Sequence, residues 1–184
     1  MRHVEHGRHL ARALGPVDGS FLDLGSGAGV PGLVLAREWP QARGVLLDAQ
    51  HKRCRFLRES VSRLGLAPRI EVRCGRAEEL AREPELRGQF ALVVARSFGR
   101  PAVTAECGVG YLAPAGRLVV SEPPVGSTGA LAVRWPAAGL ARLGLSPPAE
   151  IRHGDAGAAV MVLGEVVDDR WPRRVGRPAK SPLW

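Results

Sequence analysis

The chain has 184 residues, a length that fits one domain and is short for two. Apolar residues make up 45% of it, enough to bury a core, so an intrinsically disordered chain is excluded. Its 26 Lys and Arg against 18 Asp and Glu give a net charge of +8, which favours an anionic partner such as nucleic acid, although a compositional bias toward Arg would give the same excess.

Membrane and metal signals are absent from the sequence. No apolar run is long enough to span a bilayer, and residues 1–6 lack the apolar stretch of a secretory signal. The three cysteines, Cys54, Cys74 and Cys107, are odd in number and lack zinc spacing. We therefore expect a cytoplasmic protein with no metal site and no membrane partner, and no pattern indicates more than a monomer.

Helix and strand patterns alternate along the chain. Helical periodicity and flanking Gly or Pro predict helices over 3–14, 30–39, 51–64, 101–112 and 130–143. Short apolar or alternating runs predict strands over 20–24, 45–48, 69–73, 90–95, 117–121, 149–152 and 158–167, with a Gly/Pro-rich loop at 122–129. This order predicts an α/β fold with a mostly parallel, seven-stranded sheet that closes with an antiparallel strand pair.

Two parts of unequal size are expected. Residues 1–167 would form the domain, and 168–184 a basic tail. From Arg170 to Trp184 there are five basic residues, three prolines and no acid, which favours an extended segment. Arg173, Arg174, Arg177 and Lys180 are candidates to neutralise about four phosphates there; a purely solubilising tail is the alternative.

A glycine loop carries the main chemical signal. The run Asp23–Gly32 reads Asp-Leu-Gly-Ser-Gly-Ala-Gly-Val-Pro-Gly and joins the first predicted strand to a helix. Gly25, Gly27 and Gly29 would let the backbone turn sharply against a ligand. Asp48, at the end of the next strand, is placed to bind two ribose hydroxyls. The loop thus predicts a nucleoside cofactor.

Two cofactors match this loop. Residues 27–32 fit the dinucleotide pattern Gly-x-Gly-x-x-Gly, and the wider run fits Asp-x-Gly-x-Gly-x-Gly, the first motif of S-adenosylmethionine (SAM) methyltransferases. Asp23 lies where it would receive the methionine ammonium, and the chain is too short for a dinucleotide domain plus a substrate domain. We therefore favour SAM and a Rossmann-like class I methyltransferase fold.

Motifs spread over nearly the whole chain resemble the bacterial 16S rRNA guanine-N7 methyltransferases, also called glucose-inhibited division protein B. The similar segments are the loop with its Pro-Gly end, Leu47–Asp48 with the helix after it, Gly75–Glu79, Ala95–Phe98 and the basic run Pro172–Leu183. The resemblance implies SAM contacts from Gly25, Val30, Ala77, Glu78 and Arg96. It implies 16S rRNA, or the 30S particle, as the partner.

The chain departs from that family at the substrate side. The family has a longer region before the first strand, and its Leu-Lys-Gly after the fifth strand is replaced here by Ser121-Glu122-Pro123. Glu122 is therefore a candidate to face the methyl acceptor, or else only begins a loop. Arg96 is a candidate for the methionine carboxylate or an RNA phosphate, against a surface arginine that caps a helix.

Methyl transfer to guanine N7 needs alignment more than a general base, so no catalytic triad is expected and none is found in the sequence. Three alternatives stay open: a methyltransferase for a small-molecule acceptor, a SAM-binding protein without catalysis, and a nicotinamide dehydrogenase.

Overall fold

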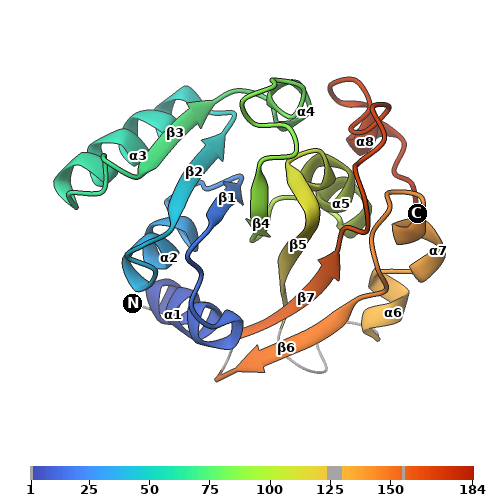
Figure 1. Cartoon of the computed structure of the whole chain (residues 1–184), viewed down its shortest axis with the longest axis horizontal. Helices are drawn as coiled ribbons and strands as arrows, with labels where there is room; N and C mark the ends of the chain where they lie inside the picture. The colour runs from blue at the N-terminus through green and yellow to red at the C-terminus, as the bar shows by residue number, and fades with distance from the viewer. Residues whose placement is uncertain (1, 124–129, 155) are drawn as a thin grey trace.

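A computed structural model describes residues 2–123, 130–154 and 156–184. Its centre is a seven-stranded sheet with the order β3-β2-β1-β4-β5-β7-β6 (Figure 1). The first five strands pair in parallel, while β7 is antiparallel to β5 and to β6. The predicted fold class is confirmed. The strands are β1 (Ser20–Leu24), β2 (Arg43–Asp48), β3 (Ile70–Cys74), β4 (Phe90–Ala95), β5 (Leu112–Glu122), β6 (Ala149–His153) and β7 (Ala156–Val162).

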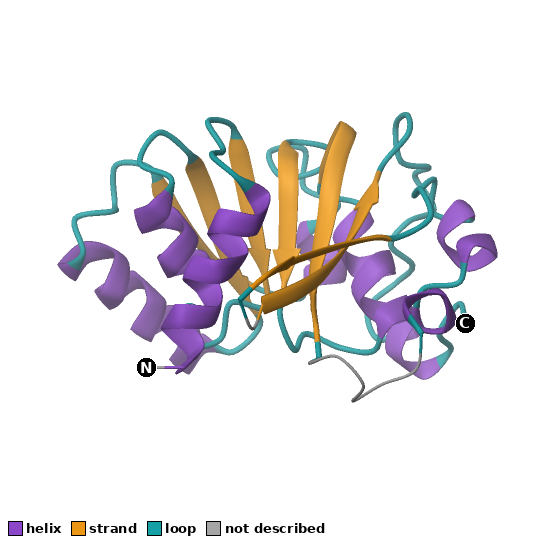
Figure 2. Ribbon diagram, turned by 90° about the horizontal axis from the view of Figure 1, so that it is seen from below, coloured by secondary structure: helices purple, strands orange, loops and turns teal. Residues whose placement is uncertain are grey.

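Helices cover both faces of this sheet (Figure 2). They are α1 (Arg2–Leu14), α2 (Gly32–Glu38), α3 (His51–Arg63), α4 (Ala77–Leu80), α5 (Pro101–Val109), α6 (Leu131–Arg134), α7 (Ala137–Ala141) and α8 (Arg177–Lys180). Strands buried on both sides create two apolar clusters. On β1, Phe21 packs with α1, α2 and α3, whereas Leu22 and Leu24 pack on the opposite side with α5 and α7.

Most predicted elements lie within a few residues of the observed ones, and the differences have local causes. The helix predicted over 130–143 is divided into α6 and α7, because Pro136 has no N–H to continue a helix. Strand β5 begins five residues before the predicted 117, and α4 and α8 were not predicted. Most of the loop predicted at 122–129 lies outside the described residues.

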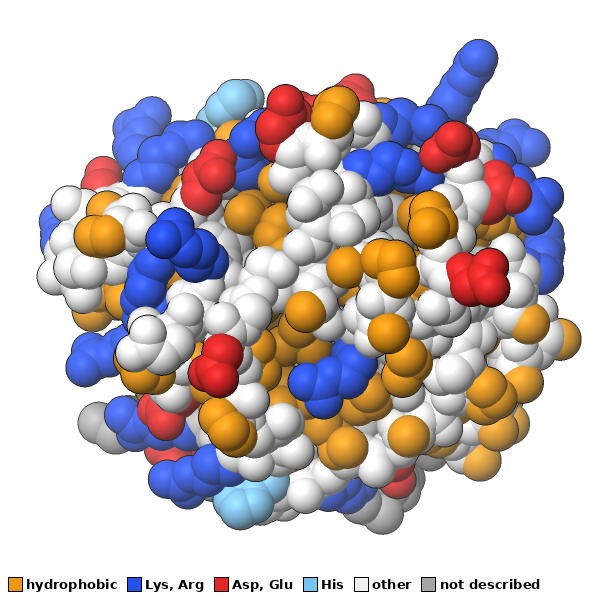
Figure 3. Space-filling model, viewed as in Figure 1, with side chains coloured by type: hydrophobic (Ala, Val, Ile, Leu, Met, Phe, Trp, Pro, Cys, Tyr) orange, Lys and Arg blue, Asp and Glu red, His pale blue; other side chains and the backbone are white. Residues whose placement is uncertain are grey.

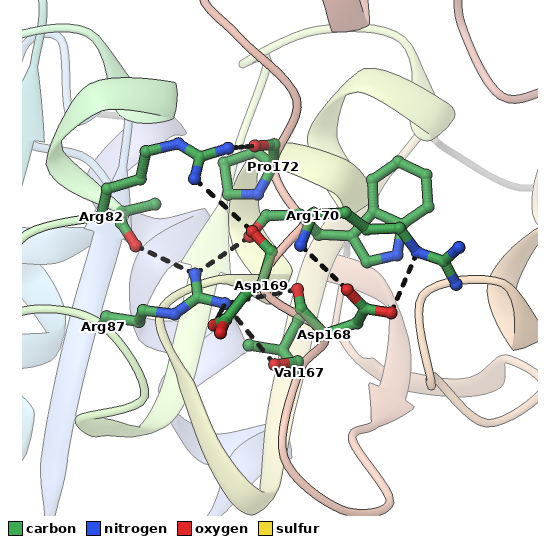
Figure 4. A network of polar contacts seen from close by, with 9 residues as sticks. Arg82, Arg87, Val167, Asp168, Asp169, Arg170 and Pro172 are labelled. Atoms are coloured by element: carbon green, nitrogen blue, oxygen red, sulfur yellow. Dashed lines mark hydrogen bonds and ion pairs between the residues drawn. The ribbon is translucent and has the colours of Figure 1, made fainter.

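The C-terminal segment 168–184 packs back onto the domain, which corrects the expectation of an extended tail. Arg87 donates to the backbone oxygens of Asp168 and Trp171, and Arg82 to that of Pro172 at 2.6 Å (Figure 4). Trp171 is 6% exposed and belongs to the main apolar cluster. Burial of the segment's apolar side chains stabilises this packing, and a count of the segment's charges does not reveal that contribution.

None of the described helices is long and apolar enough to cross a membrane.

Candidate functional site

The strand order reverses between β1 and β4, and the candidate residues gather at the carboxyl ends of the strands around that point. The glycine loop leaves β1 there and enters α2. Its backbone is fixed to β2, because the Ser26 N–H donates to the Leu47 carbonyl at 2.8 Å. Gly25, Gly27 and Gly29 all have positive φ, which glycine adopts without strain.

Asp48 fastens the loop from the end of β2. Its Oδ2 accepts from the Gly27 N–H and its Oδ1 from the Gln50 N–H, both at 2.9 Å. Its side chain is nearly buried, and the Arg53 guanidinium lies 3.6 Å from Oδ2. Each carboxylate oxygen still has acceptor capacity. Asp48 therefore sets the loop's shape and can still accept from a ribose hydroxyl.

Asp23 lies beneath the loop and is fully buried. Its Oδ2 accepts from the Gly32 N–H at 2.9 Å, while its Oδ1 has no hydrogen-bond partner. Burial is the largest cause that raises the pKa of Asp23 to about 7, and the charge of Asp48 adds to the increase. The buried carboxyl therefore titrates near neutral pH and has one oxygen to offer.

Arg96 follows β4, and it has a buried donor without an acceptor, whereas Asp23 has a buried acceptor without a donor. Its Nη1 is buried without a partner, and its Nη2 donates to Nδ1 of His3. The guanidinium lies close enough to Asp23 for its charge to lower the pKa of that carboxyl. A buried unsatisfied acceptor and a buried unsatisfied donor thus occur at the ends of neighbouring strands, where each would gain from a polar ligand.

A first cleft, of about 620 Å³, runs along the ends of β1 to β4. It is lined by Gly25, Asp48, Ala77, Glu78 and Phe98 among others. Gly25 is tightly placed, since a Cβ on it would lie 2.6 Å from the Phe98 ring. Cys107 lines the same cleft, and burial raises the pKa of its thiol, so it is not a thiolate nucleophile. The volume lies in the usual range for a small-molecule site, about 300–1,000 Å³.

A second cleft, of about 690 Å³, adjoins the first and shares Gly25, Gln50, Arg53 and Ser97 with it. Lys52, Arg53 and Arg96 give it positive charge, and Phe56, 49% exposed, supplies an aromatic face. Ser97 stands at the junction with φ +56, a strained conformation for a non-glycine residue. The sequence did not single out Gln50 or Ser97.

Glu78 and the C-terminal segment meet at the first cleft. Glu78 is 4% exposed, and its Oε1 accepts from the Gly176 N–H at 3.0 Å. Arg76 lies 3.4 Å from the same oxygen. Ala179 of α8 lines the cleft. The segment predicted as a separate tail thus contributes to the wall of the candidate cofactor site, a placement for which the sequence offered no signal.

Two of the predicted substrate residues, Glu122 and Arg173, have partners within the protein, and a third is exposed. Glu122 is 8% exposed and accepts from the Arg134 Nε at 2.8 Å and the Trp135 Nε1 at 2.9 Å. Arg173 pairs with the fully buried Glu106 at 2.6 Å. Arg174 is exposed. The contacts of Glu122 and Arg173 are structural ones, so their roles toward a substrate stay predictions that these contacts do not support.

A family model described as rRNA small subunit methyltransferase G matches residues 2–121. The chain belongs to this family. Curated relatives called ribosomal RNA small subunit methyltransferase G include one from Prochlorococcus marinus, 34% identical over 88% of this chain and 67% of the relative, and one from Moorella thermoacetica, 30% identical over 91% and 71%. A relative from Synechococcus is 40% identical, but the match covers 50% of this chain and 38% of that protein.

Solved methyltransferase structures share the fold. Mitomycin 7-O-methyltransferase MmcR has a TM-score of 0.67 at 16% identity, covering 89% of this chain and 54% of that one. The O-methyltransferase NcsB1, solved with SAM and a naphthoic acid, has a TM-score of 0.63 at 18% identity, covering 79% and 49%. These likenesses confirm the class I methyltransferase architecture of the family member.

Proposed function

We propose that the chain transfers a methyl group from SAM to N7 of a guanine in 16S rRNA. The observation that carries the proposal is a pair of buried, unpartnered atoms at the ends of β1 and β4: Asp23 Oδ1 under the glycine loop, and Arg96 Nη1 of a residue that lines the second cleft. The amino-acid end of SAM bears an ammonium, which would donate to Asp23 Oδ1, and a carboxylate, which would accept from Arg96 Nη1. Family membership supports rRNA as the substrate.

The residues of the first cleft, the cofactor cleft, fit the rest of SAM. Asp48 would accept from the ribose hydroxyls, and Ala77 and Glu78 would lie beside the adenine. The backbone amides of the glycine loop would lie along the cofactor because no side chain intervenes. Asp23 and Arg96 would orient the methionine part, through a direct contact or a bridging water, since both atoms are buried.

When bound, SAM supplies a methyl group on a positively charged sulfur. The guanine N7 lone pair forms the new N–C bond as the S–C bond breaks with its electron pair going to sulfur, so no proton is transferred in this step. A general base is therefore unnecessary. Holding acceptor and methyl group in line accounts for about 7–11 kcal/mol of barrier reduction in well-oriented systems.

The second cleft, the acceptor cleft, suits an RNA acceptor. Lys52 and Arg53 would pair with phosphates, and the exposed Phe56 ring offers a surface for a base to stack on. An enclosed, uncharged pocket would have favoured a small-molecule acceptor. The observed cleft is open and basic, so it favours a nucleic acid.

The test is methylation of 30S particles that lack the modification, with methyl-labelled SAM and analysis of the labelled nucleoside. We expect the label on N7-methylguanosine. Label on another nucleoside would show that guanine N7 is not the methylated atom. SAM binding without any turnover would favour the non-catalytic alternative. Binding of NAD in place of SAM, measured by calorimetry, would overturn the proposal altogether.

A further inference from the structure

A third concave surface lies outside the two clefts and is formed mainly by the C-terminal segment. It has a volume of about 590 Å³ and is lined by six cationic side chains: Arg82, Arg170, Arg173, Arg174, Arg177 and Lys180. In Figure 3, Lys and Arg side chains gather along the rim where Figure 1 places α8. We call this surface the basic concavity.

Not all of these charges are available. Arg173 is paired with Glu106, and Arg170 with Asp168 at 3.1 Å. Arg174, Arg177 and Lys180 are exposed, and no carboxylate of the described residues lies within ion-pair distance of them. Arg82 donates to the carbonyls of Asp169 and Pro172, which leaves its positive charge uncompensated by a carboxylate. Four positive charges therefore face the concavity without an acidic partner.

The backbone that bears these charges is held in place. The Arg173 guanidinium and its own N–H both bind the Glu106 carboxylate, and the Gly176 N–H binds Glu78. Pro172 and Pro178 are buried on either side. Fixed cations lose less entropy when they bind an anion than cations on a free tail, so this arrangement favours affinity.

We propose that the basic concavity binds the phosphate backbone of the RNA substrate at a place separate from the acceptor cleft. The proposal rests on the proposed function. Three exposed cations and Arg82, around one hollow, suit several neighbouring phosphates better than a single small anion. The surface holds no described aromatic side chain free to stack on a base, so it positions the RNA and does not read its sequence.

The placement of α8 links this surface to the cofactor. Ala179 lines the cofactor cleft, while Arg177 and Lys180 line the concavity. The acceptor cleft adjoins the cofactor cleft through Gly25 and Ser97, and no residue of α8 lines it. An RNA held at both surfaces therefore spans the cofactor cleft, and the concavity sets which region of the RNA reaches the acceptor cleft.

The test compares the intact protein with the triple variant R174Q/R177Q/K180Q. We measure binding of an rRNA fragment that contains the methylated guanine, over a series of salt concentrations, and methylation of 30S particles. The variant should bind the RNA roughly 50-fold more weakly at physiological salt, with a slope of log Kd against log salt lower by about 2. Its KM for 30S should rise while kcat and the Kd for S-adenosylhomocysteine stay unchanged.

The matched control is R12Q/R43Q/R63Q, which removes three exposed positive charges near the opposite, amino-terminal edge of the sheet. It should behave as the unmodified protein does. Equal weakening of RNA binding in both variants would show a general charge effect and overturn the proposal. An unchanged salt slope in the C-terminal variant would also overturn it.

Failure of this inference and failure of the proposed function give different results. If the unmodified protein methylates no RNA, the proposed function fails. If it methylates 30S and the C-terminal variant does so with the same KM, only the concavity's role fails. Binding of the unmodified protein to phosphatidylserine vesicles, lost in the variant while RNA binding is unchanged, would assign the surface to a membrane instead.

Discussion

Asp23 combines complete burial with a pKa near neutrality, so its charge depends on the conditions under which the protein works. Since burial raises the pKa of the folded carboxyl from 3.8 to about 7, the cofactor-free protein should lose stability as the pH rises from about 4 to 7. The loss is on the order of 4 kcal/mol. Asp23→Asn retains an acceptor for Gly32 and should lack this loss, as urea unfolding at several pH values would show.

The same carboxyl predicts how cofactor binding varies with pH. If Asp23 receives the methionine ammonium, SAM affinity should fall as the pH drops below about 7, because the protonated carboxyl has no charge to offer. Calorimetry between pH 5.5 and 8.5 measures this, and Asp23→Asn should bind weakly with little pH dependence. An equally steep profile in the variant would assign the titration to another group.

Asp48 gives a second prediction at the scale of one side chain. Asp48→Asn replaces one carboxylate oxygen by an NH2 group, which cannot accept from Gly27 or Gln50. Hydrogen bonds to charged groups contribute about 1.5–3 kcal/mol, so SAM affinity should fall by roughly 10- to 100-fold. Asp168→Asn, at the exposed pair with Arg170, is the control and should bind SAM normally.

Packing of α2 onto the sheet depends on Gly32. A Cβ there would lie 2.4 Å from both Asp23 Oδ2 and Leu46 Cδ2. Gly32→Ala should therefore cost at least about 1–3 kcal/mol of stability and disturb the loop. Gly19→Ala is the matched control, because its nearest contact would be 3.6 Å. Similar thermal unfolding of the two variants would show that the helix shifts freely.

The ion pair between Arg173 and Glu106 holds the C-terminal segment to α5. Arg173→Met leaves a fully buried carboxylate without its cation, so it should lower the free energy of unfolding by about 3–5 kcal/mol. The double variant R173M/E106M should recover part of that loss, since it removes the unpaired charge. Arg170→Gln, at an exposed pair, should cost under about 1 kcal/mol.

The sequence predicted those strands and helices whose apolar periodicity reflects the side that they bury in the fold. The Asp23–Gly32 loop and Asp48 could be placed because glycine spacing and strand order bring them together. The closure of the cleft by Gly176 and Ala179 could not, because it depends on Trp171 burying itself and on Arg173 finding Glu106 far along the chain. Glu122 was likewise predicted to begin a loop or face the acceptor, whereas it ends β5 and binds Arg134 and Trp135, which follow later in the chain.

At the scale of the whole molecule, the cofactor cleft joins strand ends from the first half of the chain to α8. S-adenosylhomocysteine should therefore slow amide hydrogen exchange both in residues 25–32 and in residues 176–181. At a ligand concentration about 1,000 times its Kd, it should also stabilise the protein by about 4 kcal/mol. Protection confined to the glycine loop would show that α8 takes no part in cofactor binding.

The contact between Gly176 and Glu78 also has a consequence for biosynthesis. A ribosome makes the glycine loop well before residues 176–179, so a growing chain has the loop before it has one wall of its cofactor cleft. The cleft of a newly made molecule is therefore complete only after residues 176–179 have emerged from the ribosome and packed against Glu78.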